Sequence, residues 1–132
     1  MKPTRLTADE AFLALMILAL EVDHDPAPRE AARAELFIHE LPRFNARPRA
    51  TVGRLIERMR DYVRDHDDGT VIAAACKAIP RASRAAALAI VATMASSDGR
   101  LQRAEATFVW RLADAMGLSS DDAATAIMSS GS

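Results

Sequence analysis

The sequence is poor in several residue types, and each shortage excludes a class of protein. Cys76 is the only cysteine among 132 residues, so no internal disulfide can form, which fits a reducing compartment. Aromatic residues make up 5% of the chain and leave few side chains to stack on bases. The apolar run Ala11–Leu20 is too short to span a bilayer, and Asp9 and Glu10 interrupt the approach that a signal peptide would need. We therefore expect a cytoplasmic protein.

Arrangements typical of catalysis are also missing. The sequence has no glycine-rich phosphate loop, serine elbow or kinase-like signature. Its histidines, His24, His39 and His66, do not have the spacing of a zinc site. Cys76 lies in an alanine-rich segment without a histidine in helical reach, so we interpret it as a small buried hydrophobic residue. We expect no catalytic site and no enzymatic activity.

The residues that are abundant favour closely packed helices. Half of the residues are hydrophobic and alanine dominates among them, which favours helices over strands. The net charge of −1 gives no global attraction to nucleic acid. The charges are nevertheless segregated, because residues 1–42 hold eight acids against four bases, whereas residues 43–64 hold seven arginines against two acids. Such a chain could present faces of opposite sign.

Apolar residues recur at helical spacing along the chain, and no stretch alternates as a strand would. Thr7 and Glu10 form a capping box that opens a helix running to about Val22. Further helices are expected from Pro28 to just before Pro42, across residues 52–63, 71–79, 83–95 and 102–116, and in a short segment after Ser119. Residues 43–50 are predicted to be a linker and residues 129–132 a frayed tail. The prediction is an all-α single domain, residues 1–132, with six or seven helices.

A pair of acids occurs twice with the same spacing. Asp23 precedes Glu30 by seven residues, and Asp98 precedes Glu105 by the same distance, at a shift of 75 in the numbering. Each pair lies between two apolar helical runs, so each marks a helix–turn–helix corner. The same shift places four apolar residues on apolar equivalents: Leu13 on Leu88, Leu15 on Ile90, Phe37 on Leu112 and Leu41 on Met116.

The repeated pattern predicts two pseudo-repeated helical-hairpin halves that form one bundle. The halves comprise about residues 7–44 and 82–119, and central helices at residues 51–80 connect them. The helical stripes of the two halves would be buried against one another.

The second corner resembles the back half of a calcium-binding loop. Asp98 is followed by a glycine, an apolar anchor two residues further on and a closing Glu105. The first acid of such a loop would fall at Met94 and the second at Ser96, so a complete calcium hand is not expected.

If the two corners meet in space, their acids would form one anionic site that a cation would neutralise. The candidate ligands are Asp23, Asp25, Glu30, Asp98 and Glu105. Calcium or magnesium fits oxygen ligands better than zinc, although His24 borders the first corner. The alternative is that these acids only cap helices and interact with the helix dipoles.

Three features together resemble the TerB family of tellurite-resistance proteins, over about Thr7 to Ile127. They are the paired Asp-(Gly)-x-(apolar)-x-x-x-Glu corner, an alanine-rich helix before each corner, and the ending Phe108–Leu112–Ala113–Gly117–Leu118. In the first corner His24 and Pro26 replace the glycine and the apolar anchor. The resemblance implies an all-helical cytoplasmic domain associated with stress response and metal binding, without established catalysis. The family pattern carries over to Asp98 and Glu105 and, less closely, to Asp23 and Glu30.

An arginine-rich face and one tryptophan are candidates for contact with a partner. Arg54, Arg58, Arg60 and Arg64 lie opposite an apolar stripe and could bind phosphate or an anionic membrane surface; the alternative is a solvated face partly neutralised by Glu57 and Asp61. Trp110 lies off the core stripe of its helix, where it would either cover the edge of the bundle or anchor a partner. These residues define the alternative function, a protein-interaction module. Its expected partners are other proteins or a membrane surface rather than nucleic acid, and a homo-oligomer is compatible with the sequence.

Overall fold

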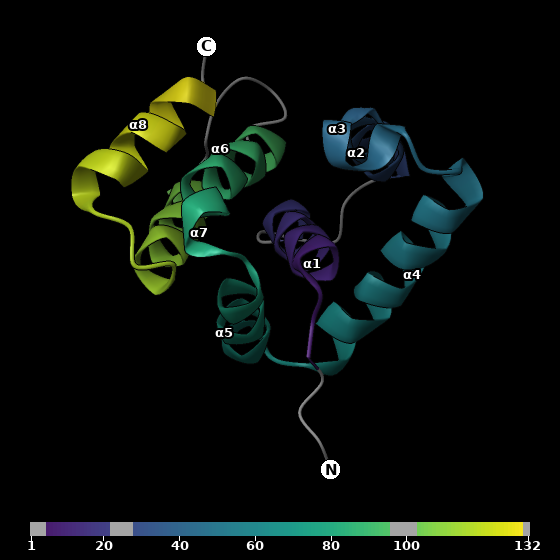
Figure 1. Cartoon of the computed structure of the whole chain (residues 1–132), viewed down its shortest axis with the longest axis horizontal. Coiled ribbons are helices and arrows are strands. Elements are labelled where there is room, and N and C mark those ends of the chain that lie inside the picture. Colours follow the sequence, from purple (N-terminus) through teal and green to yellow (C-terminus); the bar gives the residue numbers. More distant parts are fainter. Residues whose placement is uncertain (1–4, 22–27, 96–102, 131–132) are drawn as a thin grey trace.

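The structure is all-α in the part of the chain that it describes. The computed structural model describes residues 5–21, 28–95 and 103–130, and these ranges contain eight α-helices, one 3₁₀ turn and no strand (Figure 1). The predicted fold class is therefore confirmed. The elements are α1 (Ala8–Leu20), α2 (Pro28–Glu40), α3 (Pro42–Asn45), α4 (Arg49–Asp65), α5 (Asp68–Ala78), η1 (Arg81–Ser83), α6 (Arg84–Ala95), α7 (Arg103–Ala115) and α8 (Ser120–Ser130). Among the described residues, no helix has the combined length and hydrophobicity needed to cross a membrane.

Helix α1 is the central element of the bundle. Figure 1 shows α2, α3 and α4 on one side of it and α5 to α8 on the other. Helix α1 packs against α4, α5, α6 and α7, and all nine residues from Ala11 to Ala19 are buried. Apolar residues at helical spacing predict burial along one stripe of a helix, but in α1 the whole circumference is covered between Ala11 and Ala19. A helix that is apolar all round is stable only when other elements enclose it.

Local hydrogen bonds fix the start of α1 and the end of α7. The Thr7 hydroxyl accepts a bond from the Glu10 backbone N–H at 3.1 Å, and the Glu10 carboxylate accepts one from the Thr7 N–H at 2.8 Å, so the predicted capping box is confirmed. At the end of α7, Gly117 has a φ of 74°. The Leu118 N–H donates to the Ala113 carbonyl at 3.1 Å, which completes a glycine C-cap just after the predicted helix at residues 102–116.

The predicted linker at residues 43–50 is wrong at both ends, because residues 43–45 belong to α3 and Arg49 and Ala50 begin α4. Pro42–Asn45 forms the short helix α3, with Pro42 in the first helical position. Phe44 is 1% exposed and belongs to the core. One buried aromatic side chain is enough to hold a single helical turn in place. The sequence did not predict this turn because the residues around Phe44 are polar or proline. The described chain thus has one helix more than the seven predicted at most.

The helix boundaries agree with the predicted repeat, whereas the packing of the helices differs between the halves. Adding 75 to both bounds of α2 gives the bounds of α7, and the end of α1 corresponds in the same way to the end of α6. However, α6 packs against α7, while α2 packs mainly against α3. The internal repeat therefore stays a prediction.

Candidate functional site

The acidic corners fall largely outside the part of the chain that the structure describes. Asp23, Asp25 and Asp98 lie outside the described residues, and of Glu30 only its place in the first turn of α2 is described. Glu105 lies half-buried in the first turn of α7. Among the described residues, no three or more His, Cys, Asp or Glu side chains are grouped so that they could hold a metal ion. The metal site therefore stays a prediction.

The structure does describe the helix ends that lead into the two corners. Helices α1 and α6 pack against each other. Leu20, the last residue of α1, and Met94, the penultimate residue of α6, line the same small crevice. Glu35 of α2 and Arg60 of α4 line it as well. The C-terminal ends of α1 and α6 are thus neighbours in space, although they are more than 70 residues apart in the chain.

A second group of acids, at the start of α1, is bound by arginines from two other elements. The Asp9 carboxylate accepts hydrogen bonds from Arg43 of α3, at 2.6 Å, and from Arg47, which follows α3. The Glu10 carboxylate accepts one from Arg58 of α4 at 2.6 Å. These ion pairs fasten the N-terminus of α1 to α3 and α4. Their acids and bases come from the oppositely charged segments of the sequence, which therefore meet instead of forming separate faces.

Two aromatic rings complete the surroundings of Asp9. The Arg43 guanidinium lies 5.4 Å from the centre of the Phe12 ring, and the Arg47 guanidinium lies 5.8 Å from that of Phe44. A guanidinium at this distance from a ring gains a further favourable interaction. We call these five residues, Asp9, Phe12, Arg43, Phe44 and Arg47, the Asp9 cluster.

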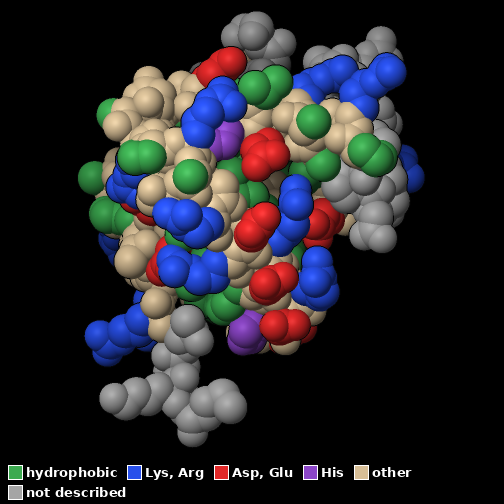
Figure 2. Space-filling view, turned by 90° about the vertical axis from the view of Figure 1, so that its right-hand side faces the viewer, with side chains coloured by type: hydrophobic (Ala, Val, Ile, Leu, Met, Phe, Trp, Pro, Cys, Tyr) green, Lys and Arg blue, Asp and Glu red, His purple; other side chains and the backbone are tan. Residues whose placement is uncertain are grey.

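The predicted arginine face is therefore partly neutralised within the molecule. Figure 2 shows acidic and basic side chains intermixed on the face that contains α4. Arg58 pairs with Glu10, and Arg64 approaches Asp61 at 3.5 Å. Arg54 lines an open cavity of about 560 Å³ beside the start of α1, and Arg60 lines the small crevice that α1, α2, α4 and Met94 of α6 enclose. The sequence-based prediction considered only acids on the same helix as the arginines. It missed Asp9 and Glu10 of α1 because no regular spacing links these acids to the arginines. Binding of a partner by these arginines stays a prediction.

The Asp9 cluster makes the stability of the protein depend on pH. Burial raises the pKa of Asp9, but the hydrogen bonds and charges of Arg43 and Arg47 outweigh it and hold this pKa below its usual 3.8. A carboxyl whose pKa is lowered in the folded state stabilises that state above the unfolded-state pKa, and this contribution is lost as the pH falls through the folded-state pKa. We expect Asp9→Asn to lower the free energy of unfolding by about 1–2 kcal/mol at pH 7, because two arginines lose their charged acceptor.

Chemical denaturation of the parent and of Asp9→Asn at a series of pH values measures this effect. The difference should shrink below pH 4 as Asp9 of the parent becomes protonated. Asp61→Asn is the matched control, because the Asp61 side chain is 69% exposed and its ion pair is long, so its effect should stay within about 0.5 kcal/mol. A difference for Asp9→Asn that is the same at pH 7 and pH 3 would contradict the assignment.

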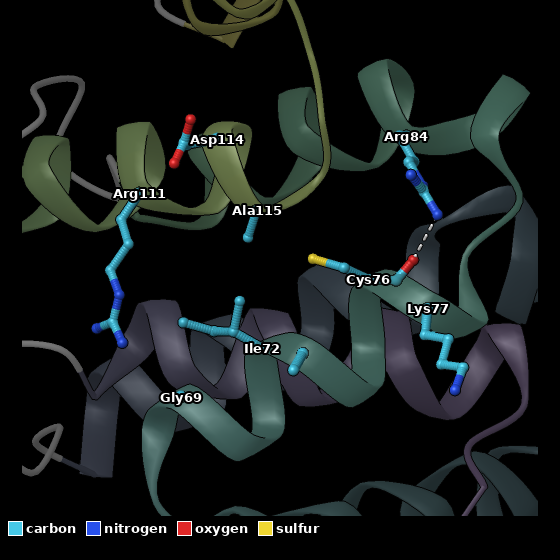
Figure 3. A pocket seen from close by; sticks show the side chains of 9 residues that line it. Gly69, Ile72, Cys76, Lys77, Arg84, Arg111, Asp114 and Ala115 are labelled. Carbon is cyan, nitrogen blue, oxygen red and sulfur yellow. Dashed lines mark hydrogen bonds between the residues drawn. The ribbon is translucent and has the colours of Figure 1, made fainter.

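An open groove of about 580 Å³ lies between α5, the start of α6 and α7 (Figure 3). Its lining residues are Gly69, Ile72, Ala73, Cys76, Lys77, Arg84, Arg111, Asp114 and Ala115. Cys76 is 5% exposed and burial raises the pKa of its thiol, against a smaller opposite effect of Arg84. The prediction that Cys76 is buried is thus confirmed. No motif in the sequence indicated the groove, because its walls come from three separate segments.

Arg84 ties the ends of two helices together at one end of the groove. Its guanidinium donates to three backbone carbonyls, those of Cys76 at 2.9 Å, Met116 at 3.0 Å and Ile79 at 3.1 Å. Carbonyls at the C-terminus of a helix lack partners within that helix and carry partial negative charge. The Arg84 side chain therefore satisfies the C-terminal ends of α5 and α7 at the same time.

The remaining candidates are one tryptophan and the histidines. Trp110 is 46% exposed on α7, as expected for a residue off the core stripe, and its binding of a partner stays a prediction. The His66 ring lies against that of Tyr62 in a tilted arrangement, with ring centres 4.3 Å apart, and its Nδ1 is 2.8 Å from the Tyr62 carbonyl oxygen. His39 is half-buried in α2, and His24 lies outside the described residues.

The fold defines the class of protein as an all-α helical bundle built around one enclosed helix. A family model described as "Tellurite resistance protein TerB" matches residues 9–127 of the chain. The chain therefore belongs to the TerB family, and the resemblance found in the sequence is confirmed. No curated protein and no solved structure matches the chain.

Proposed function

We propose that this chain is a non-enzymatic binding module of the TerB family that holds a divalent cation at its two acidic corners. The proposed ligands are Asp23, Asp25, Glu30, Asp98 and Glu105. Calcium or magnesium is the proposed ion, because these cations prefer carboxylate oxygens. The module would act in the cytoplasm in a stress response of the tellurite-resistance type, in keeping with the family to which the chain belongs.

One observation carries this proposal: the helix ends that precede the corners are neighbours. Leu20 and Met94 line one crevice. Asp23 follows Leu20 by three residues and Asp98 follows Met94 by four. An extended chain covers about 3.5 Å per residue, so the two acids have the reach to approach one another.

Electrostatics favours a cation once such acids approach. Carboxylates that share a site repel one another, and some of them must then be protonated or neutralised. Arg60 lines the adjoining crevice, but Glu35 lines it too and offsets that positive charge. A bound cation would supply the missing positive charge and would link the two corners.

Thermal unfolding of chelator-stripped protein with added calcium, magnesium or zinc tests the proposal. An ion present at a hundred times its dissociation constant adds about 2.7 kcal/mol to the free energy of unfolding, which raises the midpoint by roughly 10 °C. Calcium or magnesium should produce this rise, and Asp98→Asn/Glu105→Gln should abolish it. Asp121→Asn/Asp122→Asn on α8 is the matched control with the same loss of charge, and it should keep the full rise.

Two other outcomes would change the assignment. A rise with zinc alone would point to His24 instead of an oxygen site. The absence of a shift with any of the three ions would contradict cation binding and leave the acids as helix caps. In that case the alternative function, a protein-interaction module, would take precedence, and the exposed Trp110 is the observation that favours it.

A further inference from the structure

The groove between α5 and α7 has the walls and floor of a helix-binding surface. Gly69 and Ala73 are one helical turn apart on α5, and both line the groove together with Ala115 of α7. Figure 3 shows Ala115 pointing from α7 towards α5. Ile72 and Cys76, which are 4% and 5% exposed, form the apolar floor between these small residues. Small side chains on two neighbouring helices let a third helix come within the usual interaxial distance of about 8–10 Å.

The charges around this groove are mainly positive, although the whole chain has a net charge of −1. Lys77 and Arg111 are exposed, and neither has an ion-pair partner within the described ranges. Arg84 adds a third positive charge that its three carbonyl partners hold in place. Among the described residues of the lining there is one acid, Asp114 of α7, against these three cations, and Arg111 extends towards α5 in Figure 3. The apolar floor thus has unpaired cations on both walls.

Trp110 extends the apolar surface beyond the groove. It precedes Asp114 by four residues on α7, so the two side chains lie on the same side of that helix. Since Trp110 is 46% exposed, its ring offers a large apolar surface at the edge of the groove. Tryptophan is enriched among the residues that contribute most to binding in protein interfaces.

We infer that the α5–α7 groove binds an acidic amphipathic helix of a partner protein. The apolar face of that helix would lie on Ile72, Cys76 and Ala115, and its carboxylates would pair with Arg111 and Lys77. This mode, a helix laid into an apolar groove between two helices, is a common form of protein recognition. The inference goes beyond the proposed cation site and does not depend on it, because it rests only on described residues of α5, α6 and α7, and none of these is a proposed ligand of the cation.

The fluorescence of Trp110, the single tryptophan of the chain, allows a direct test. The probe is a synthetic peptide of about five helical turns, with leucine and alanine on one face and glutamate on the flanks. A second peptide carries lysine at every glutamate position. The full chain is titrated with each peptide in the presence of chelator, so that cation binding at the corners has no influence. We expect a saturable change with the acidic peptide and at least tenfold weaker binding of the basic one.

A charge exchange shows whether the groove itself is the binding site. In Lys77→Glu/Arg111→Glu, both substitutions are at exposed positions, so the fold should persist, as circular dichroism can verify. This variant should bind the acidic peptide at least tenfold more weakly than the parent and should gain affinity for the basic peptide. Arg54→Glu/Arg64→Glu on α4 is the matched control with the same change of charge, and it should bind like the parent.

Three results would overturn the inference. The first is the absence of a saturable signal with the acidic peptide up to about millimolar concentration, where binding free energies fall to near 4 kcal/mol. The second is equal affinity for the two peptides. The third is an unchanged affinity of Lys77→Glu/Arg111→Glu, which would place the peptide elsewhere on the molecule.

Discussion

Replacing Leu15 with aspartate is expected to leave no folded protein. Leu15 is 0% exposed in the middle of α1, which is enclosed on all sides. A carboxylate at this position would lose its hydration without gaining an ion-pair partner, and that penalty approaches the whole stability of a small domain. The same result is expected for Leu112→Asp, since Leu112 is equally buried on α7. Circular dichroism and size-exclusion chromatography of the purified variants measure the outcome.

Leu36→Asp is the matched control for these two substitutions. It makes the same change of side chain on α2, but Leu36 is 50% exposed. The free energy of unfolding should therefore change by about 0.5 kcal/mol or less. If Leu15→Asp unfolded at the same denaturant concentration as the parent protein, the buried faces assigned to the helices would be wrong.

The second large effect is expected at Arg84. Arg84→Ala removes three hydrogen bonds to the ends of α5 and α7 and leaves their carbonyls without this charged donor. Because the site is only partly buried, water can replace some of these bonds, and we expect the free energy of unfolding to fall by about 2–4 kcal/mol. Urea denaturation followed by circular dichroism measures this change.

Two further variants separate charge from geometry at this position. Arg84→Lys keeps the positive charge but cannot present a planar set of donors to three carbonyls, so it should recover less than half of the lost stability. Arg81→Ala removes an exposed arginine from the adjacent 3₁₀ turn and should have an effect within about 0.5 kcal/mol. A stability of Arg84→Ala equal to that of the parent would show that the three bonds contribute nothing.

The helices could be predicted from the sequence because their signals are local. The spacing of apolar residues indicated seven helices. The Thr7 capping box marks the start of α1 and Gly117 follows the end of α7, and each of these signals lies within a few residues of the helix end that it marks. Short-range patterns of this kind depend on helix geometry alone. Helix α3 was not predicted because Phe44 is its one buried residue and the residues around Phe44 are mostly polar, so no apolar periodicity marks the helix.

The contacts between distant segments could not be predicted in the same way. Arg43 and Arg47 pair with Asp9 from positions 34 and 38 residues further along the chain, and no periodicity links the three residues. The α5–α7 groove likewise exists only after three separate segments have packed together. For the acidic corners the sequence is more informative than the structure. Their repeated pattern is clear in the sequence, whereas the structure describes mainly the helices beside them.

The enclosed position of α1 also has a consequence for the synthesis of the protein. Helix α1 leaves the ribosome before α5, α6 and α7, the helices that cover much of its surface. At about 5–20 residues per second, the 75 residues between the end of α1 and the end of α6 take roughly 4–15 s to translate. During this interval α4 can cover only part of the apolar run from Ala11 to Ala19, so the nascent chain presents the type of segment that molecular chaperones bind.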